Sequence, residues 1–162
     1  MNNFPDLKDI VTFVTCHETG NAGIYNCTFY YDDVHIDFTL RLIDKLSTIK
    51  KYNFIIKCLK AHPFPKFSEI TKDWISKKHY SNIIYKDDKL IDNLRLSCKA
   101  IITIPSSAIL ESEKTKVDTL VLYHHGCKVR EKAETFFKYI KLRKFSDIND
   151  GINAVEKFLL ED

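Results

Sequence analysis

The stretch that decides the fold is Lys99-Ala100-Ile101-Ile102-Thr103-Ile104, which ends at Pro105. A short, continuous apolar run that is rich in β-branched residues and closed by proline is typical of a strand buried on both faces. Residues 53–59 and 117–123 have the same character. Because helical patterns separate the three runs, we expect them to lie side by side as parallel strands of one sheet.

Helices are predicted where apolar residues recur at spacings of three and four. They cover residues 33–50, 68–75, 87–96, 127–140 and 148–159, with a turn or short helix at 108–114. Asp147 is expected to cap the last helix, because a carboxylate at that position accepts the N–H groups of the first turn. A brief edge strand is predicted at 142–145.

The N-terminal part of the chain predicts a hairpin. Residues 10–16 and 24–31 are rich in β-branched and aromatic side chains, and residues 18–23 between them have turn chemistry. The fold class is therefore predicted as α/β: a mixed, mostly parallel sheet of about five or six strands with an N-terminal hairpin, flanked by amphipathic helices. We expect residues 1–162 to form a single domain.

The composition excludes several classes of protein. With 44% apolar and 29% charged residues the chain is globular rather than disordered, and a net charge of +3 does not favour nucleic acid as a partner. No apolar run is long enough to span a membrane, and no secretory leader is recognised at the start. The five cysteines form no CxxC pair, so we expect free thiols and a cytoplasmic protein.

The candidate site residues follow the predicted parallel strands. In such a sheet, ligands bind beyond the carboxyl ends of the strands. Six residues are expected there: His62, Ser106, Ser107, His124, His125 and Cys127. They could bind a small anion, or a histidine could activate a serine, or the thiol of Cys127 or Cys16, as a nucleophile. The simpler interpretation is that polar loop residues collect at every strand end.

A metal site is a weaker hypothesis. Cys16-His17-Glu18 and His124-His125-Gly126-Cys127 offer thiolate and imidazole ligands that suit zinc, but neither segment has a recognised ligand spacing. The chain has four glycines and no glycine-rich phosphate-binding motif. No metal and no cofactor are therefore predicted.

The C-terminal part has a recognisable pattern. A strand ends at Pro105 and Ser106, a second segment covers 119–125, a helix follows, and residues 142–147 lead into a helix at 151–159. This order resembles the C-terminal part of bacterial STAS-like domains, the relatives of anti-sigma-factor antagonists. The family's phosphorylatable Asp-Ser-Gly-type loop is replaced here by residues 61–68. The resemblance implies a non-enzymatic regulatory or binding module.

Two functions remain open at this point, and the sequence does not decide whether the protein is an enzyme. The first is a STAS-like module that acts by protein binding, as a signalling antagonist or neutralising partner, with homodimerisation also open. Trp74, Tyr80 and Tyr85 could form its contact surface, although aromatics at helical spacing are more often core. The alternative is a small hydrolase or transferase acting on a phosphate-containing or nucleotide substrate at the carboxyl ends of the central strands.

Overall fold

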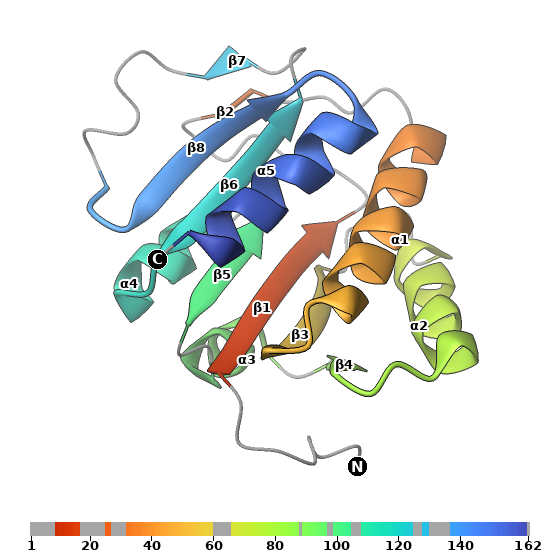
Figure 1. Ribbon diagram of the computed structural model, residues 1–162. Coiled ribbons are helices and arrows are strands. Elements are labelled where there is room, and N and C mark those ends of the chain that lie inside the picture. The colour runs from red at the N-terminus through yellow and green to blue at the C-terminus, as the bar shows by residue number, and fades with distance from the viewer. Residues whose placement is uncertain are drawn as a thin grey trace.

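The computed structural model describes residues 9–16, 25–26, 32–59, 66–87, 89–96, 99–104, 108–124, 128–129 and 137–161 (Figure 1). The strands are β1 (Asp9–Cys16), β2 (Tyr25–Asn26), β3 (Tyr52–Leu59), β4 (Ile83–Tyr85), β5 (Ala100–Thr103), β6 (Thr119–His124), β7 (Lys128–Val129) and β8 (Ile140–Phe145). The helices are α1 (Asp32–Thr48), α2 (Lys66–Lys78), α3 (Leu90–Leu96), α4 (Ala108–Thr115) and α5 (Ile148–Leu160).

The main sheet has six strands in the order β4-β3-β1-β5-β6-β8, and every neighbouring pair is parallel. Numbered along the chain, these strands run 3-2-1-4-5-6, which is the order of doubly wound, Rossmann-like folds. The α/β class is therefore confirmed, as is the parallel direction of the three apolar runs. β1 lies between two of them, β3 and β5.

The helices cover both faces of the sheet. Alternate strand residues point to opposite faces, so Val11 and Phe13 lie in the large core with α1, α2 and α5, whereas Val14 packs with Leu94 of α3 and Ala108 of α4. Figure 1 shows α1 and α5 on the near side of the sheet and α3 and α4 beyond it. We call the two sides the α1/α5 face and the α3/α4 face.

The α1/α5 face closes around two stacked phenylalanine rings. Phe38 of α1 and Phe145 at the end of β8 have ring centroids 5.0 Å apart and planes inclined by 11°. Gly151 of α5 packs directly on them, since a Cβ added there would lie 2.7 Å from Cε2 of Phe38. The Asp147 side chain accepts a 2.8 Å hydrogen bond from the Asp150 N–H, which confirms the predicted cap of this helix.

The predicted N-terminal hairpin is wrong. Within the run 24–31, the structure describes only Tyr25–Asn26 as a strand, and it pairs antiparallel with Lys128–Val129 rather than with β1. The reason lies in the sheet: β1 is bonded on one side to β3 and on the other to β5. It therefore offers no edge to a following strand.

The predicted helix over 127–140 is also wrong where the structure describes it. Residues 128–129 form β7, residues 137–139 are not helical, and Ile140 opens β8. Ile140 pairs with Thr119, so β8 starts before the predicted residue 142. The short edge strand β4 was not predicted, and α3 begins at Leu90 rather than at residue 87.

The aromatic surface suggested by the sequence is part of the interior. Trp74, Tyr80 and Tyr85 are partly buried and pack against the large core beneath α2. The core interpretation of these side chains therefore holds. Among the helices that the structure describes, none combines the length and apolar composition needed to cross a bilayer.

Candidate functional site

The candidate site is the carboxyl edge of the sheet between β1 and β5. From β1 the chain turns to α1 on the α1/α5 face, whereas from β5 it turns to α4 on the α3/α4 face. The connections therefore leave these neighbouring strands in opposite directions. In doubly wound proteins this switch point is where ligands bind.

The strand ends form a step at the switch point. Thr103, the last residue of β5, pairs with Val14 of β1 and Val121 of β6. β1 continues to Cys16 and β6 to His124, which at about 3.3 Å per residue is roughly 7 and 10 Å further. β5 therefore ends before both of its neighbours along the strand direction, which leaves a recess between them. The first residue of α4, Ala108, packs close by against Val14.

A buried lysine lies beside this step. Lys57 of β3 pairs with Val14, which in turn pairs with Thr103, so the three residues share one row and the α3/α4 face. Strands are about 4.8 Å apart, so the Cα atoms of Lys57 and Thr103 are roughly 10 Å apart. The Lys57 residue is only 7% exposed. Burial disfavours the charged form of a lysine unless opposite charges or hydrogen bonds accompany it.

The polar groups at this end of the α1/α5 face have a structural role. The Thr15 and Thr39 hydroxyls lie 3.1 Å apart and join β1 to α1. Burial raises the pKa of the Cys58 thiol to about 11, although a hydrogen bond with Thr71 opposes the shift. Cys58 is therefore a protonated, structural thiol at neutral pH rather than a nucleophile.

Most of the predicted site residues lie outside the described residues. This holds for His62, Ser106, Ser107, His125 and Cys127, and for His124 the backbone alone is described, as the last residue of β6. The segments that contain them follow the carboxyl ends of β3, β5 and β6, which share one edge. That their side chains meet there stays a prediction.

The segment after β1 was misinterpreted as a hairpin turn. It holds Gly20 and Gly23, two of the four glycines of the chain, and it follows the strand next to the switch point. Glycines after the first strand of a doubly wound sheet allow close approach of a phosphate. Residues 17–24 themselves lie outside the described part of the chain.

The zinc hypothesis gains no support. The structure holds no group of three or more histidine, cysteine, aspartate or glutamate side chains suited to a metal ion among the residues it describes. The histidines and cysteines of that hypothesis belong to segments or side chains outside this part.

No protein-family model and no curated protein matches the chain. Solved structures with a similar fold include the S. aureus MnaA–UDP complex, with a TM-score of 0.61 and 15% identity over 95% of this chain and 37% of that one. The E. coli heptosyltransferase WaaC with ADP has a TM-score of 0.60 and 14% identity, over 97% and 45%. The Methanocaldococcus jannaschii UDP-GlcNAc 2-epimerase with UDP-GlcNAc and UDP has a TM-score of 0.59 and 17% identity, over 98% of this chain and 41% of that one.

These comparisons correct the predicted family. The fold is Rossmann-like and similar to parts of two heptosyltransferases and a UDP-GlcNAc 2-epimerase, so the STAS-like resemblance is wrong, and so is the regulatory, protein-binding function that depended on it. The order strand, helix, strand, capped helix recurs in many α/β proteins, so it cannot distinguish one family from another. The alternative hypothesis, a small hydrolase or transferase acting on a phosphate-containing or nucleotide substrate, agrees better with these neighbours. This chain spans less than half the length of these neighbours.

Proposed function

We propose that this chain is the nucleotide-binding part of an enzyme that acts on nucleotide sugars, and that it holds a nucleoside diphosphate at the switch point. The observation that carries this proposal is the all-parallel order β4-β3-β1-β5-β6-β8, with its change of direction between β1 and β5. Doubly wound folds bind nucleotides at that position. The neighbours solved with UDP or ADP support the choice of ligand.

The diphosphate would lie over the step at the end of β5. The N-terminus of α4 follows that strand, and the positive end of a helix dipole favours phosphate. Ser106 and Ser107 would donate hydroxyl hydrogen bonds to the phosphate oxygens, and Lys57 would supply positive charge from β3. His124 and His125 would contact the ligand from the end of β6 and transfer protons. His62 and Cys127 would border the same edge.

The proposal assigns binding to this chain and the chemistry at the sugar to the whole enzyme, because the neighbours are more than twice as long as this chain. We also propose that the protein is located in the cytoplasm. The free, buried thiol of Cys58 is compatible with a reducing compartment.

Isothermal titration calorimetry with UDP and with ADP tests the proposal. A Ser106→Ala/Ser107→Ala variant should bind the preferred nucleotide about tenfold or more weakly, because it loses hydrogen bonds to charged oxygens. A His124→Ala/His125→Ala variant should also bind more weakly. The matched control is Ser76→Ala/Ser81→Ala, which changes two exposed serines on α2 and before β4 and should bind like the unmodified protein. The proposal is refuted if neither UDP nor ADP binds at millimolar concentration. It is also refuted if both variants bind the nucleotide as tightly as the unmodified protein does.

A further inference from the structure

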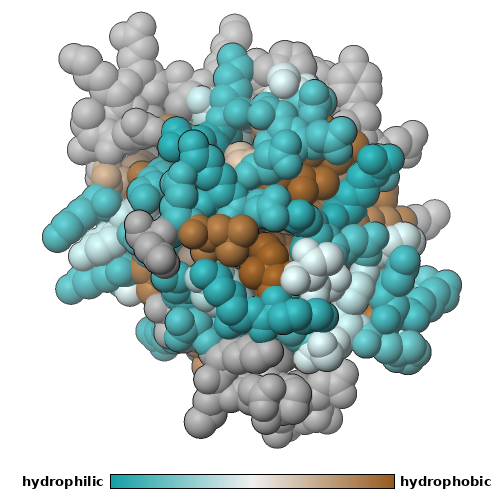
Figure 2. Space-filling view, viewed as in Figure 1, coloured by the Kyte–Doolittle hydropathy of each residue, from teal (hydrophilic) through white to brown (hydrophobic). Residues whose placement is uncertain are grey.

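A hollow lies away from the switch point, between α5 and the outer strands. It has a volume of about 510 Å³, and Lys99, Lys141, Arg143, Asn153 and Phe158 are among the residues that line it. We call it the α5 groove. Figure 2 shows this side of the molecule, where an apolar area in the middle is bordered by hydrophilic side chains. The volume is within the range of small-molecule sites.

The two walls of the α5 groove follow from helix and strand periodicity. Asn153, Ala154, Lys157 and Phe158 line the groove and recur at spacings of three and four, so they share one side of α5. Lys141 and Arg143 of β8 pair with Leu120 and Leu122 of β6, which belong to the large core on the α1/α5 face. The two cations therefore lie on the same face of the sheet as α5.

The floor of the α5 groove is apolar. Ala100, Leu120 and Leu159 are buried residues that line it. The Phe158 ring stands at its side with the Lys141 ammonium 5.8 Å from its centroid. The groove thus combines a hydrophobic floor with a charged rim.

The charge on the rim is unbalanced. In the described part of the chain, Lys99, Lys141 and Arg143 have no carboxylate partner within 4 Å, whereas cations elsewhere do, as in Arg95–Asp92 and Lys114–Glu111. The acidic side chains of the groove are partly engaged. Asp150 accepts a 3.0 Å hydrogen bond from the Ser146 N–H, and Glu161 pairs with Lys157 at 3.5 Å. Asp118 is the remaining carboxylate of the lining.

Protection of the sheet edge does not account for all of these charges. Lysine and arginine on an edge strand do discourage pairing with other sheets, and β8 is an edge strand. Lys99, however, precedes β5, which lies two strands inside that edge. Lys141 and Arg143 also lie on the face that α5 covers, so their positive charges line the α5 groove.

We propose that the α5 groove binds a phosphate monoester joined to an apolar or aromatic group. A phosphate dianion would offset two of the three positive charges, and the Arg143 guanidinium can pair with two of its oxygens. The attached group would cover the floor and contact Phe158. The groove reaches the start of β5, whereas the switch point lies at the other end of that strand. This inference therefore does not depend on the proposed nucleotide site.

Titration of the protein with phenyl phosphate, followed by ¹H–¹⁵N NMR, tests the inference. The amide signals of Lys99, Arg143 and Asn153 should shift saturably. Inorganic phosphate, which lacks the ring, and benzoate, which carries one charge fewer, should both bind more weakly. A Lys141→Gln/Arg143→Gln variant should bind phenyl phosphate about tenfold or more weakly, and the spectrum itself reports whether the variant is folded.

The matched control is Arg95→Gln/Lys114→Gln, which removes the same two charges where each is paired with a carboxylate. It should bind phenyl phosphate like the unmodified protein. Equal weakening in both variants, or absence of shifts at the three signals, would overturn the inference. A saturating concentration of UDP or ADP should leave phenyl phosphate bound in the groove. If UDP or ADP displaces phenyl phosphate, the inference of a site separate from the nucleotide site is wrong. If UDP and ADP bind nowhere, only the proposed function is refuted.

Discussion

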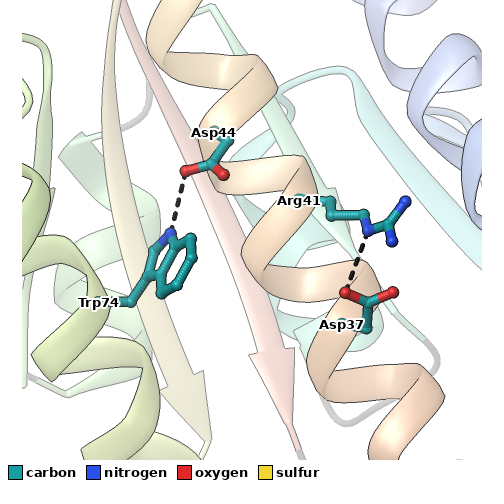
Figure 3. Close-up of polar contacts among 4 residues, drawn as sticks. All are labelled: Asp37, Arg41, Asp44 and Trp74. Atoms are coloured by element: carbon teal, nitrogen blue, oxygen red, sulfur yellow. Dashed lines mark hydrogen bonds and ion pairs between the residues drawn. The ribbon is translucent and has the colours of Figure 1, made fainter.

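Asp44 on α1 accepts a 3.0 Å hydrogen bond from the indole nitrogen of Trp74 on α2 (Figure 3). The same carboxylate oxygen accepts a hydrogen bond from the Tyr80 hydroxyl. Burial, together with this carboxylate, raises the pKa of Tyr80, so the hydroxyl stays protonated and continues to donate. One carboxylate therefore joins α1 to α2 and to the segment that leads into β4.

Replacement of Asp44 by alanine should lower the free energy of unfolding by about 1–3 kcal/mol, because two partly buried donors lose their acceptor. Urea unfolding followed by circular dichroism measures the change. Asp37→Ala is the control: Asp37 forms an exposed pair with Arg41 one turn away on the same helix, and its loss should cost about 0.5 kcal/mol or less. Equal losses in the two variants would contradict the role of Asp44.

Replacement of Gly151 by alanine should destabilise the protein by about 1–3 kcal/mol, although alanine is the better helix former. The new Cβ would lie 2.7 Å from Cε2 of Phe38 and 3.3 Å from Cγ of Phe145, so the stacked rings would have to move. Thermal unfolding measures the loss. Asn153→Ala, at an exposed position of the same helix, should be neutral or slightly stabilising.

A double-variant cycle gives a sharper version of the Gly151 test. Phe38→Leu removes the ring that the new methyl group would meet, so Gly151→Ala should cost less in that background than in the unmodified protein. If the cost is the same in both, contact with Phe38 is not the cause.

The contribution of Cys58 to stability should depend on pH. Burial raises its pKa from the ordinary value of 9.0 to about 11, so the folded protein holds the thiol proton more tightly than the unfolded chain. This contribution is complete below pH 9 and is lost as the pH rises through 11. At pH 10 the loss is about 1.4 kcal/mol.

Urea unfolding of the protein and of Cys58→Ala at pH 7 and pH 10 isolates this effect, because the other titrating groups are common to both proteins. The stability difference between them should narrow by about 1.4 kcal/mol at the higher pH. A difference that is independent of pH would mean that the thiol is not desolvated as described.

Elements with strong local patterns could be predicted from the sequence. The apolar runs that became β3, β5 and β6, and the periodic apolar residues of α1 and α5, identified these elements to within a few residues. Such elements are encoded by their own side chains. Asp147 was recognised for the same reason, since a cap acts within one helical turn.

Features that depend on distant parts of the chain could not be predicted. Tyr25 pairs with Val129, and neither residue carries a sign of the other. The run 24–31 has the composition of a strand, but the position beside β1 was already occupied by β3 and β5. Residues 127–140 contain apolar residues at helical spacing, yet Ile140 is drawn into the sheet by its pairing with Thr119.

For the candidate site, the structure can be compared with the sequence only at the level of the sheet edge. The parallel direction of the strands was sufficient to place the segments that hold Ser106 and His124 at one edge. The switch point itself requires the strand order, which periodicity does not contain. The burial of Lys57 was not predicted either, because a single lysine in an apolar strand gives no sign of whether the folded sheet buries it.

The central place of β1 has a consequence for how the molecule assembles. This strand bonds to β3 about forty residues later and to β5 about ninety residues later. Closing such a long stretch of chain costs entropy before its contacts form, which slows folding. During synthesis, β1 therefore remains an edge with open backbone groups until β5 has left the ribosome, and an interrupted chain that ends at α3 would expose an apolar strand prone to aggregation.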